Sequence, residues 1–250
     1  RMGANMARRL HDQNFTITAV HDVHADGAKA LAEEVSATYY EKLTHVTKNS
    51  DVIITVVTDD KAMKNIFNGT GSLLARAKGN MEELVASALT REVRNVLWVY
   101  EIRDPRRPDL PQIGLGGMAR TAQIRTEATP QGTIIRNEGI REPKSRGRAD
   151  LIEATSAIVG TVNNAVDDAS GAIQTALRSH ADSAAPDFEV TDHHGNLHRV
   201  WIVDDAGAIA GFRKLFAEEP HAYVADGNHR SAAAAMLGYE TFLAVFFPAA

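Results

Sequence analysis

The sequence predicts an α/β protein in two parts: a partial parallel sheet with helices, followed by an α+β region whose strands pair in both directions. Between residues 15 and 67, strand-like and helix-like segments alternate, which is typical of βαβ units and a parallel sheet. Beyond residue 80, a hairpin-like segment and separate helices replace that alternation. We therefore expect one domain at residues 1–79 and a second at residues 80–250.

The first part is expected to alternate between helices and strands. We expect helices at residues 1–10, 26–35 and 61–67, and strands at residues 15–22 and 51–57. Asp26 is suited to cap the second of these helices. The run DVIITVV, residues 51–57, is almost continuously apolar, which is typical of a strand covered on both faces of its sheet.

The second part mixes helices with strands. We expect helices at residues 80–93, 149–166, 171–180 and 206–217, strands at residues 95–104 and 113–124, and a hairpin at residues 188–205. The segment RTAQIRTEAT, residues 120–129, alternates as a strand does. GLGGMA, residues 114–119, is similar to a nucleotide-binding loop, but no strand precedes it and no helix follows, so we predict no nucleotide site there.

The composition predicts a soluble, cytoplasmic protein. A net charge of −5 gives no general attraction to nucleic acid or to anionic membranes, and no apolar run is long enough to span a bilayer. The absence of cysteine excludes disulfides, thiolate metal sites and a thiol nucleophile. The chain starts at Arg1 without an export signal and ends in the apolar run FLAVFFPAA, so we expect a piece of a longer protein.

The segment YVADGNHRSAAAAM, residues 223–236, is the strongest candidate for a functional site. A short strand turns through Gly227 into an alanine-rich helix, whose first turn has amide N–H groups without helical partners. These donors and the helix dipole favour an anion. The polar residues gathered at this turn are Asp226, Asn228, His229, Arg230 and Ser231. The pattern predicts a phosphate or nucleotide site.

The side chains near this turn suit phosphoryl transfer. Arg230 offers a planar fork of donors to phosphate oxygens, and His229 can donate a hydrogen bond or shuttle a proton near neutral pH. Asp226 is suited to hold Mg²⁺ beside the phosphates of ADP or ATP. Glu138 lies in the basic stretch of residues 136–148 and is the candidate base for an attacking hydroxyl group.

Simpler structural roles remain open for these residues. Asp226 is a common type of N-cap or turn residue, Arg230 also suits an ordinary surface position, and a basic stretch is often a solvated face. Three histidines near the predicted hairpin turn have no acidic or thiolate partners in the sequence pattern, which disfavours a metal there. They are His193, His194 and His198.

The first part resembles the N-terminal, NAD(P)-binding half of the β-hydroxyacid dehydrogenases, such as 3-hydroxyisobutyrate and 6-phosphogluconate dehydrogenases. RMGANMA, residues 1–7, is similar to the second half of their fingerprint G-x-G-x-M-G-x-x-M-A. The resemblance implies a Rossmann-type fold in which Gly3 lets a helix pack closely on a strand and Asp22 binds the ribose of NAD. It also implies that Val57 and Thr58 lie at the nicotinamide.

This resemblance is incomplete. The first strand and the first two glycines of the fingerprint are absent, so half of the phosphate cradle is missing. The catalytic lysine motif of the family is also absent, because Lys144 follows Pro143, which we expect to prevent the helical setting that the motif needs. We therefore expect that the truncated segment does not bind NAD(P) usefully. An NAD(P)-dependent dehydrogenase remains an alternative function.

Residues 80–250 resemble a conserved bacterial family of unassigned function, related to the ParB/sulfiredoxin-like fold that also includes a free-serine kinase. That family pairs an H-E-x-T…K…R segment with a late A-D-G-H-H-R motif, to which residues 225–230 are similar. Glu138, Lys144 and Arg148 match the first segment. Two of its positions differ here, because Asn137 replaces the histidine and Ile140 replaces the threonine.

This second resemblance implies a kinase-like enzyme that binds ADP or ATP with Mg²⁺ and phosphorylates a small hydroxyl compound. The expected catalytic residues are Glu138, Asp226, His229 and Arg230, with Asp226 as the metal ligand. The expected phosphate-binding residues are Lys144, Arg148, Gly227, Asn228 and Ser231. A third hypothesis is a non-enzymatic binder of nucleotides, or less readily of nucleic acid, that uses the basic stretch of residues 136–148.

Overall fold

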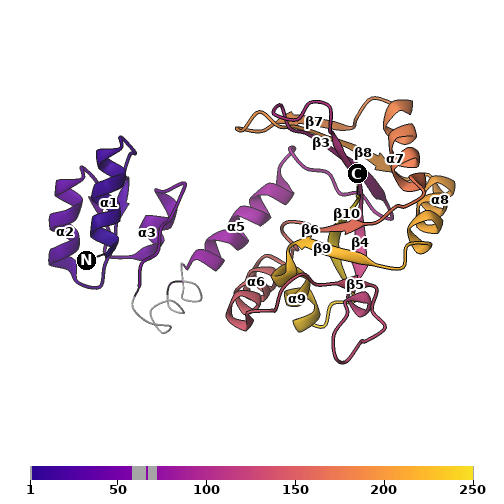
Figure 1. Ribbon diagram of the computed structural model, residues 1–250. Helices are drawn as coiled ribbons and strands as arrows, with labels where there is room; N and C mark the ends of the chain where they lie inside the picture. Colours follow the sequence, from indigo (N-terminus) through magenta and orange to yellow (C-terminus); the bar gives the residue numbers. More distant parts are fainter. Residues whose placement is uncertain (1, 58–65, 67–71, 250) are drawn as a thin grey trace. The chain divides into compact units, whose positions relative to one another are not determined.

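The computed structural model describes residues 2–57, 66 and 72–249 (Figure 1). The chain divides into two compact units. Unit 1 comprises residues 1–90 and 154–156, and unit 2 comprises residues 91–153 and 157–250. The helix α5, Leu73–Ala86, continues through residues 79 and 80, between which we predicted the domain boundary. None of the described helices combines the length and the apolar character that a membrane span needs.

Unit 1 contains a small parallel sheet. Its described elements are α1 (Met2–Asp12), β1 (Ala19–Val20), α2 (Ala25–Glu34), β2 (Thr38–Tyr39), α3 (Leu43–Lys48) and α5. The strands β1 and β2 pair in parallel and are joined by α2, so a βαβ unit is present as expected, but its second strand, β2, was not predicted. The buried residues of α2 and its C-cap recur at helical spacing and form the apolar face of this helix. They are Ala28, Leu31, Ala32 and Val35.

Several predictions for unit 1 are wrong. Residues 51–57 form no strand, and Val52 and Ile54 are 79% and 52% exposed, because no neighbouring strand pairs with this apolar run among the described residues. The strand at β1 ends at Val20, before Asp22. Asp26 lies inside the first turn of α2 and does not cap it, since the N-cap position is His24.

One predicted element of unit 1 falls largely outside the described residues. The helix expected at residues 61–67 is described only at residue 66. The helix expected at residues 80–93 is right only for residues 80–86, because α5 begins earlier, behind the capping hydroxyl of Ser72, and ends at Ala86, and residues 87–93 are not helical.

Unit 2 is built on one mixed sheet of eight strands (Figure 1). The strands are β3 (Leu97–Arg103), β4 (Gln112–Arg120), β5 (Ile134–Ile135), β6 (Val162–Val166), β7 (Phe188–Thr191), β8 (Leu197–Val203), β9 (Ala222–Asp226) and β10 (Thr241–Pro248). Their spatial order is β5-β9-β6-β10-β4-β3-β8-β7. The pairs β5·β9 and β6·β10 are parallel and the other pairs are antiparallel, which confirms the mixed pairing expected for this region.

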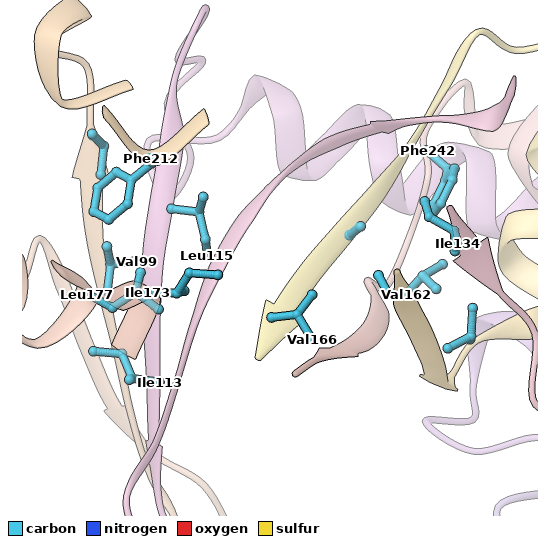
Figure 2. Packing of buried hydrophobic residues seen from close by; sticks show 14 of the residues in the cluster. Val99, Ile113, Leu115, Ile134, Val162, Val166, Ile173, Leu177, Phe212 and Phe242 are labelled. Carbon is cyan, nitrogen blue, oxygen red and sulfur yellow. The ribbon is translucent and has the colours of Figure 1, made fainter. Parts of the chain in front are cut away.

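Four α-helices and one short 3₁₀ helix accompany this sheet. They are α6 (Glu142–Thr155), α7 (Ala172–Ser183), α8 (Ala206–Ala217), α9 (Asn228–Met236) and the 3₁₀ turn Thr121–Gln123. The main core lies between the sheet and α7 and α8, where Leu177 and Phe212 meet Val99 and Leu115 (Figure 2). Phe242 of β10 is completely buried, in accord with the central position of that strand.

The glycines of GLGGMA lie in the sheet, within the strand expected at residues 113–124. They lie within β4, where Gly116 is paired with Trp98 of β3. A Cβ atom at Gly116 would lie 1.9 Å from Cε2 of Trp98, so only glycine leaves room for the indole ring. The glycine at this position is therefore explained by the close packing of β4 against Trp98 of β3.

Three predictions for unit 2 are wrong. Residues 149–166 do not form one helix, because α6 ends at Thr155 and β6 begins at Val162 after Gly160, which has a φ of +88°. Residues 120–129 contain a 3₁₀ turn and a loop in place of a strand extending through them. Pro143 does not prevent a helix at Lys144, since it lies in the first turn of α6, where the missing N–H is not needed.

Candidate functional site

The candidate site is built where β9 ends and α9 begins. Gly227 connects them with a φ of +101°, a left-handed conformation that favours glycine. Its carbonyl accepts hydrogen bonds from the amides of Arg230 and Ser231, at 2.8 and 3.1 Å. No side chain caps α9, so the amides of Asn228 and His229 are the first-turn donors left for an anion.

Arg230 lies against this glycine turn. Its Nη2 donates to Oδ2 of Asp226 at 2.6 Å, while its Nε is buried and has no hydrogen-bond partner among the described residues. A Cβ atom at Gly227 would lie 3.0 Å from this Nε, and one at Gly160 would lie 3.6 Å from the Arg230 Cδ. Two glycines with positive φ thus bring backbone close to the guanidinium group. The side chain of Asp226 is 71% exposed, so the ion pair has a solvent-facing side.

His229 is positioned by α6. The Oγ of Ser145 lies 3.3 Å from the Nδ1 of His229, and Ser145 is completely buried. The other ring nitrogen, Nε2, lies 4.0 Å from Oε1 of Glu138, a distance for an ion pair when the histidine is protonated but too long for a hydrogen bond. This arrangement brings a proton carrier and a carboxylate together beside the start of α9.

Two asparagines connect the loop that holds Glu138 to the motif. The Nδ2 of Asn228 donates to Oδ1 of Asn137, and Nδ2 of Asn137 donates to the carbonyl of Ala225 at 3.5 Å. Asn228 is 4% exposed and its Oδ1 has no partner among the described residues. These hydrogen bonds hold the loop of Glu138 beside the end of β9 and the start of α9.

The predicted phosphate-binding residues fall into two groups. Gly227 and Asn228 form the turn itself, and the buried Ser231 donates to the Asn228 carbonyl at 3.0 Å and so holds the first turn of α9. Lys144 and Arg148 are exposed on α6, and no side-chain contact joins either of them to the motif within the described chain. Within the basic stretch, Arg146 is engaged elsewhere, in ion pairs with Asp150 and Glu153.

The donor set does not fit a metal ion held by protein side chains alone. Asp226 is already paired with Arg230, and no group of three histidine, aspartate or glutamate side chains in the described ranges could surround a cation. Near the hairpin, the expectation that the histidines have no acidic partner is wrong for His198, whose Nε2 lies 3.2 Å from Oδ2 of Asp192. A magnesium ion at Asp226 would have to arrive with the phosphates that it binds.

The residues predicted to bind NAD(P) lie in unit 1. Gly3 is in α1, and a Cβ atom there would lie 3.4 Å from the Cβ of Val56, an ordinary van der Waals contact with a residue outside any strand, so this position does not require a glycine. Asp22 is exposed and accepts a hydrogen bond from the amide of His24 at 2.9 Å. Val57 is half-buried, and Thr58 lies outside the described residues.

Two residues of the site escaped the sequence analysis. Ser145 lies four residues before the buried Ala149 on α6, a helical spacing that would have indicated an inward-facing serine if the helix had been started at residue 142. Gly160 was hidden inside a helix predicted for residues 149–166. The glycine followed by the β-branched Thr161 and Val162 was the available signal for a turn into a strand.

The comparisons with known proteins give one family. A family model described as "Protein of unknown function (DUF1015)" matches residues 21–242, on both sides of residue 79. Neither the comparison with curated proteins nor the comparison with solved structures found a match. Because the matched range covers most of the 250 residues, including every residue of the site at the start of α9, the chain belongs to the DUF1015 family.

Proposed function

We propose that unit 2 binds the phosphates of ADP or ATP at the start of α9 and transfers a phosphoryl group to a small hydroxyl compound. The observation that carries this proposal is the guanidinium of Arg230. It is held against an uncapped helix N-terminus by two glycine turns, and its buried Nε has no partner among the described residues. A phosphate oxygen is a chemically suitable partner for both the guanidinium and the helix amides.

The neighbouring side chains supply the other groups that phosphoryl transfer needs. The imidazole of His229, held by Ser145, is suited to hydrogen-bond a phosphate oxygen. Glu138 is 63% exposed, which leaves its carboxylate accessible to a hydroxyl group from solvent. The resemblance of residues 80–250 to the fold that includes a free-serine kinase points to the same class of reaction.

The proposed step is an in-line transfer. The oxygen of the acceptor hydroxyl forms a bond to the γ-phosphorus of ATP, the bond from that phosphorus to the β–γ bridging oxygen breaks, and ADP leaves. The hydroxyl proton passes to Glu138. Arg230 and the first amides of α9 hold the phosphate oxygens while charge shifts onto the leaving group.

A calorimetric titration of the whole chain tests this proposal. We expect saturable binding of ADP and ATP at one site, and no saturable binding of NAD or of a short DNA duplex. Each titration is done with and without Mg²⁺, which shows whether the ion enters with the nucleotide. If the chain bound DNA in a salt-dependent way and did not bind ADP or ATP, the result would favour the hypothesis of a non-enzymatic nucleic-acid binder.

A further inference from the structure

A cavity with a mixed apolar and polar lining lies at the opposite end of α9 from the candidate site. It has a volume of about 610 Å³ and is bordered by the 3₁₀ turn at Thr121–Gln123, by the loop that follows it and by the residues after α9. This volume is in the range of small-molecule sites, roughly 300–1,000 Å³. The cavity lies wholly within unit 2.

Arg136 is the chemically distinctive residue of this cavity. It follows β5 directly and is half-buried, and its Nε is buried without a hydrogen-bond partner among the described residues. Burial lowers the pKa of the guanidinium from its ordinary value, and an arginine stays charged despite such a shift. A charge held partly out of water without a counter-charge is unfavourable, and an oxyanion would offset that penalty.

The other charges in the cavity leave it net positive. Arg120, at the end of β4, lines it and is exposed, without an ion pair in the described ranges. Glu240 is the acid on its border. The cavity lies near the C-terminus of α9, where free carbonyls would repel an anion, but amides of Leu237, Gly238 and Tyr239 already donate to carbonyls of the last turn.

The wall of the cavity is preformed. The hydroxyl groups of Thr126 and Thr129 lie 2.7 Å apart, and the Thr129 hydroxyl also donates to the Ile124 carbonyl at 2.6 Å. The amide of Arg125 donates to the Ile134 carbonyl at 2.8 Å, which joins this loop to the strand that precedes Arg136. A wall held by such bonds loses little conformational freedom when a ligand binds.

From this cavity, we infer a second oxyanion site in which Arg136 and Arg120 bind the carboxylate or phosphate group of a small molecule. The site is distinct from the one proposed at the start of α9. Its border includes Ala235 and Gly238, seven or more residues along the chain from Asn228, which is about 10 Å at the helical rise. The inference does not depend on a phosphotransferase activity.

Nuclear magnetic resonance of the ¹⁵N-labelled whole chain tests this inference. Inorganic phosphate and malonate are titrated separately, with chloride at matched ionic strength as the control salt. We expect a saturable shift of the Arg136 Nε–H signal with one or both anions, together with shifts of the backbone amides of Gly238 and Tyr239. The pair of anions distinguishes a phosphate ligand from a carboxylate ligand.

Variants then assign the effect to the cavity. Arg136→Lys keeps the charge but removes the fork, and we expect it to weaken the anion-induced shifts of Gly238 and Tyr239 by about tenfold or more in affinity. Glu240→Gln should strengthen them. Arg213→Lys is the matched control, since Arg213 is exposed on α8 and does not border the cavity, and it should change nothing.

Two results would overturn the inference. One is the absence of a saturable shift at Arg136 with either anion, or an equal shift with chloride, which requires no variant. The other is an unchanged affinity in a folded Arg136→Lys protein. A different result would contradict the phosphotransferase proposal alone. In that case Arg230→Gln would leave ADP binding intact, and the phosphate-induced shift at Arg136 would still be observed.

Discussion

At the scale of single residues, a substitution of Arg230 distinguishes a ligand-binding role of this residue from a structural role. Its side chain is 23% exposed and pairs with the exposed Asp226, so removing it leaves a carboxylate that water can solvate. The loss of this ion pair should therefore have a small effect on stability. The contact with a phosphate would be lost in full.

We therefore expect Arg230→Ala to weaken ADP or ATP binding by about 2 kcal/mol, the scale of a charge-assisted hydrogen bond. The free energy of unfolding should fall by about 1 kcal/mol or less. Calorimetry and urea unfolding measure the two effects, with Arg213→Ala as the control. A protein that unfolds readily but still binds nucleotide would make Arg230 a structural residue.

Glu138 is tested by its chemistry. A base acts in the chemical step and contributes little to holding the nucleotide. We expect Glu138→Gln to leave ADP affinity nearly unchanged and to reduce transfer to a hydroxyl acceptor by about a hundredfold or more. The control is Glu218→Gln, at the exposed end of α8. Equal losses of binding and turnover would show instead that Glu138 orders the site, for example through His229.

At the scale of elements, the packing of β3 on β4 depends on Gly116. A methyl group there would collide with the ring of Trp98, which lies directly across the strand pair. We expect Gly116→Ala to lower the free energy of unfolding by about 3 kcal/mol, because overpacking forces the ring or the backbone to move.

The matched control for this substitution has the opposite sign. Gly211 lies inside α8 with open space around the position of its Cβ. We expect Gly211→Ala to raise the free energy of unfolding by about 0.5–1 kcal/mol, since alanine is the better helix residue. Urea unfolding measures both variants, and equal stabilities for the two would contradict the packing argument.

At the same scale, the small sheet of unit 1 is where we predict no useful NAD binding. The described parallel sheet has two strands of two residues each, and residues 51–57 add no third strand. Asp22 also accepts a hydrogen bond from His24. We expect no saturable NAD binding at millimolar concentration by calorimetry. Micromolar binding would contradict this and favour the dehydrogenase hypothesis.

At the scale of the whole of unit 2, the buried carboxylate of Glu101 connects β3 and β8 to the helix α7. Glu101 of β3 is 2% exposed and forms ion pairs with Arg103, with Arg178 of α7 and with Arg199 of β8. Burial by itself would raise the pKa of Glu101, but the hydrogen bonds and charges of Arg103 and Arg178 outweigh burial and lower it.

This lowered pKa gives the stability of unit 2 a pH dependence with a definite sign. A carboxyl group with a depressed pKa stabilises the fold above its unfolded pKa, about 4.3, and that contribution is lost as the pH falls through the folded value. Glu101→Gln should lower the free energy of unfolding by about 3 kcal/mol at neutral pH, because Arg103 and Arg178 lose the charged acceptor of their hydrogen bonds. Urea unfolding across this range should show the gap between the two proteins narrowing in acid. A gap that is constant with pH would contradict the role of the charge.

Much of the fold could be predicted where residues a few positions apart decide the structure. The helix expected at residues 206–217 matches α8, and the hairpin around Gly195 matches β7 and β8. The turn of Gly227 into α9 was likewise visible, because a glycine before an alanine-rich run suits a left-handed position ahead of a helix. Local conformational preference and apolar spacing are sufficient in such segments.

The tertiary structure alone decided the partners of these segments. The apolar run of residues 51–57 has the sequence pattern of a buried strand. A strand also needs a neighbouring strand to pair with, and no such neighbour is described beside this run. The equally apolar β10 became central because β4 and β6 pair with it on both sides. In the same way, only the packing of α6 brings Ser145 to His229, and only the fold carries Arg136 to the far end of α9. Sequence spacing sets which face of an element is apolar, whereas burial against distant residues determines what that face meets.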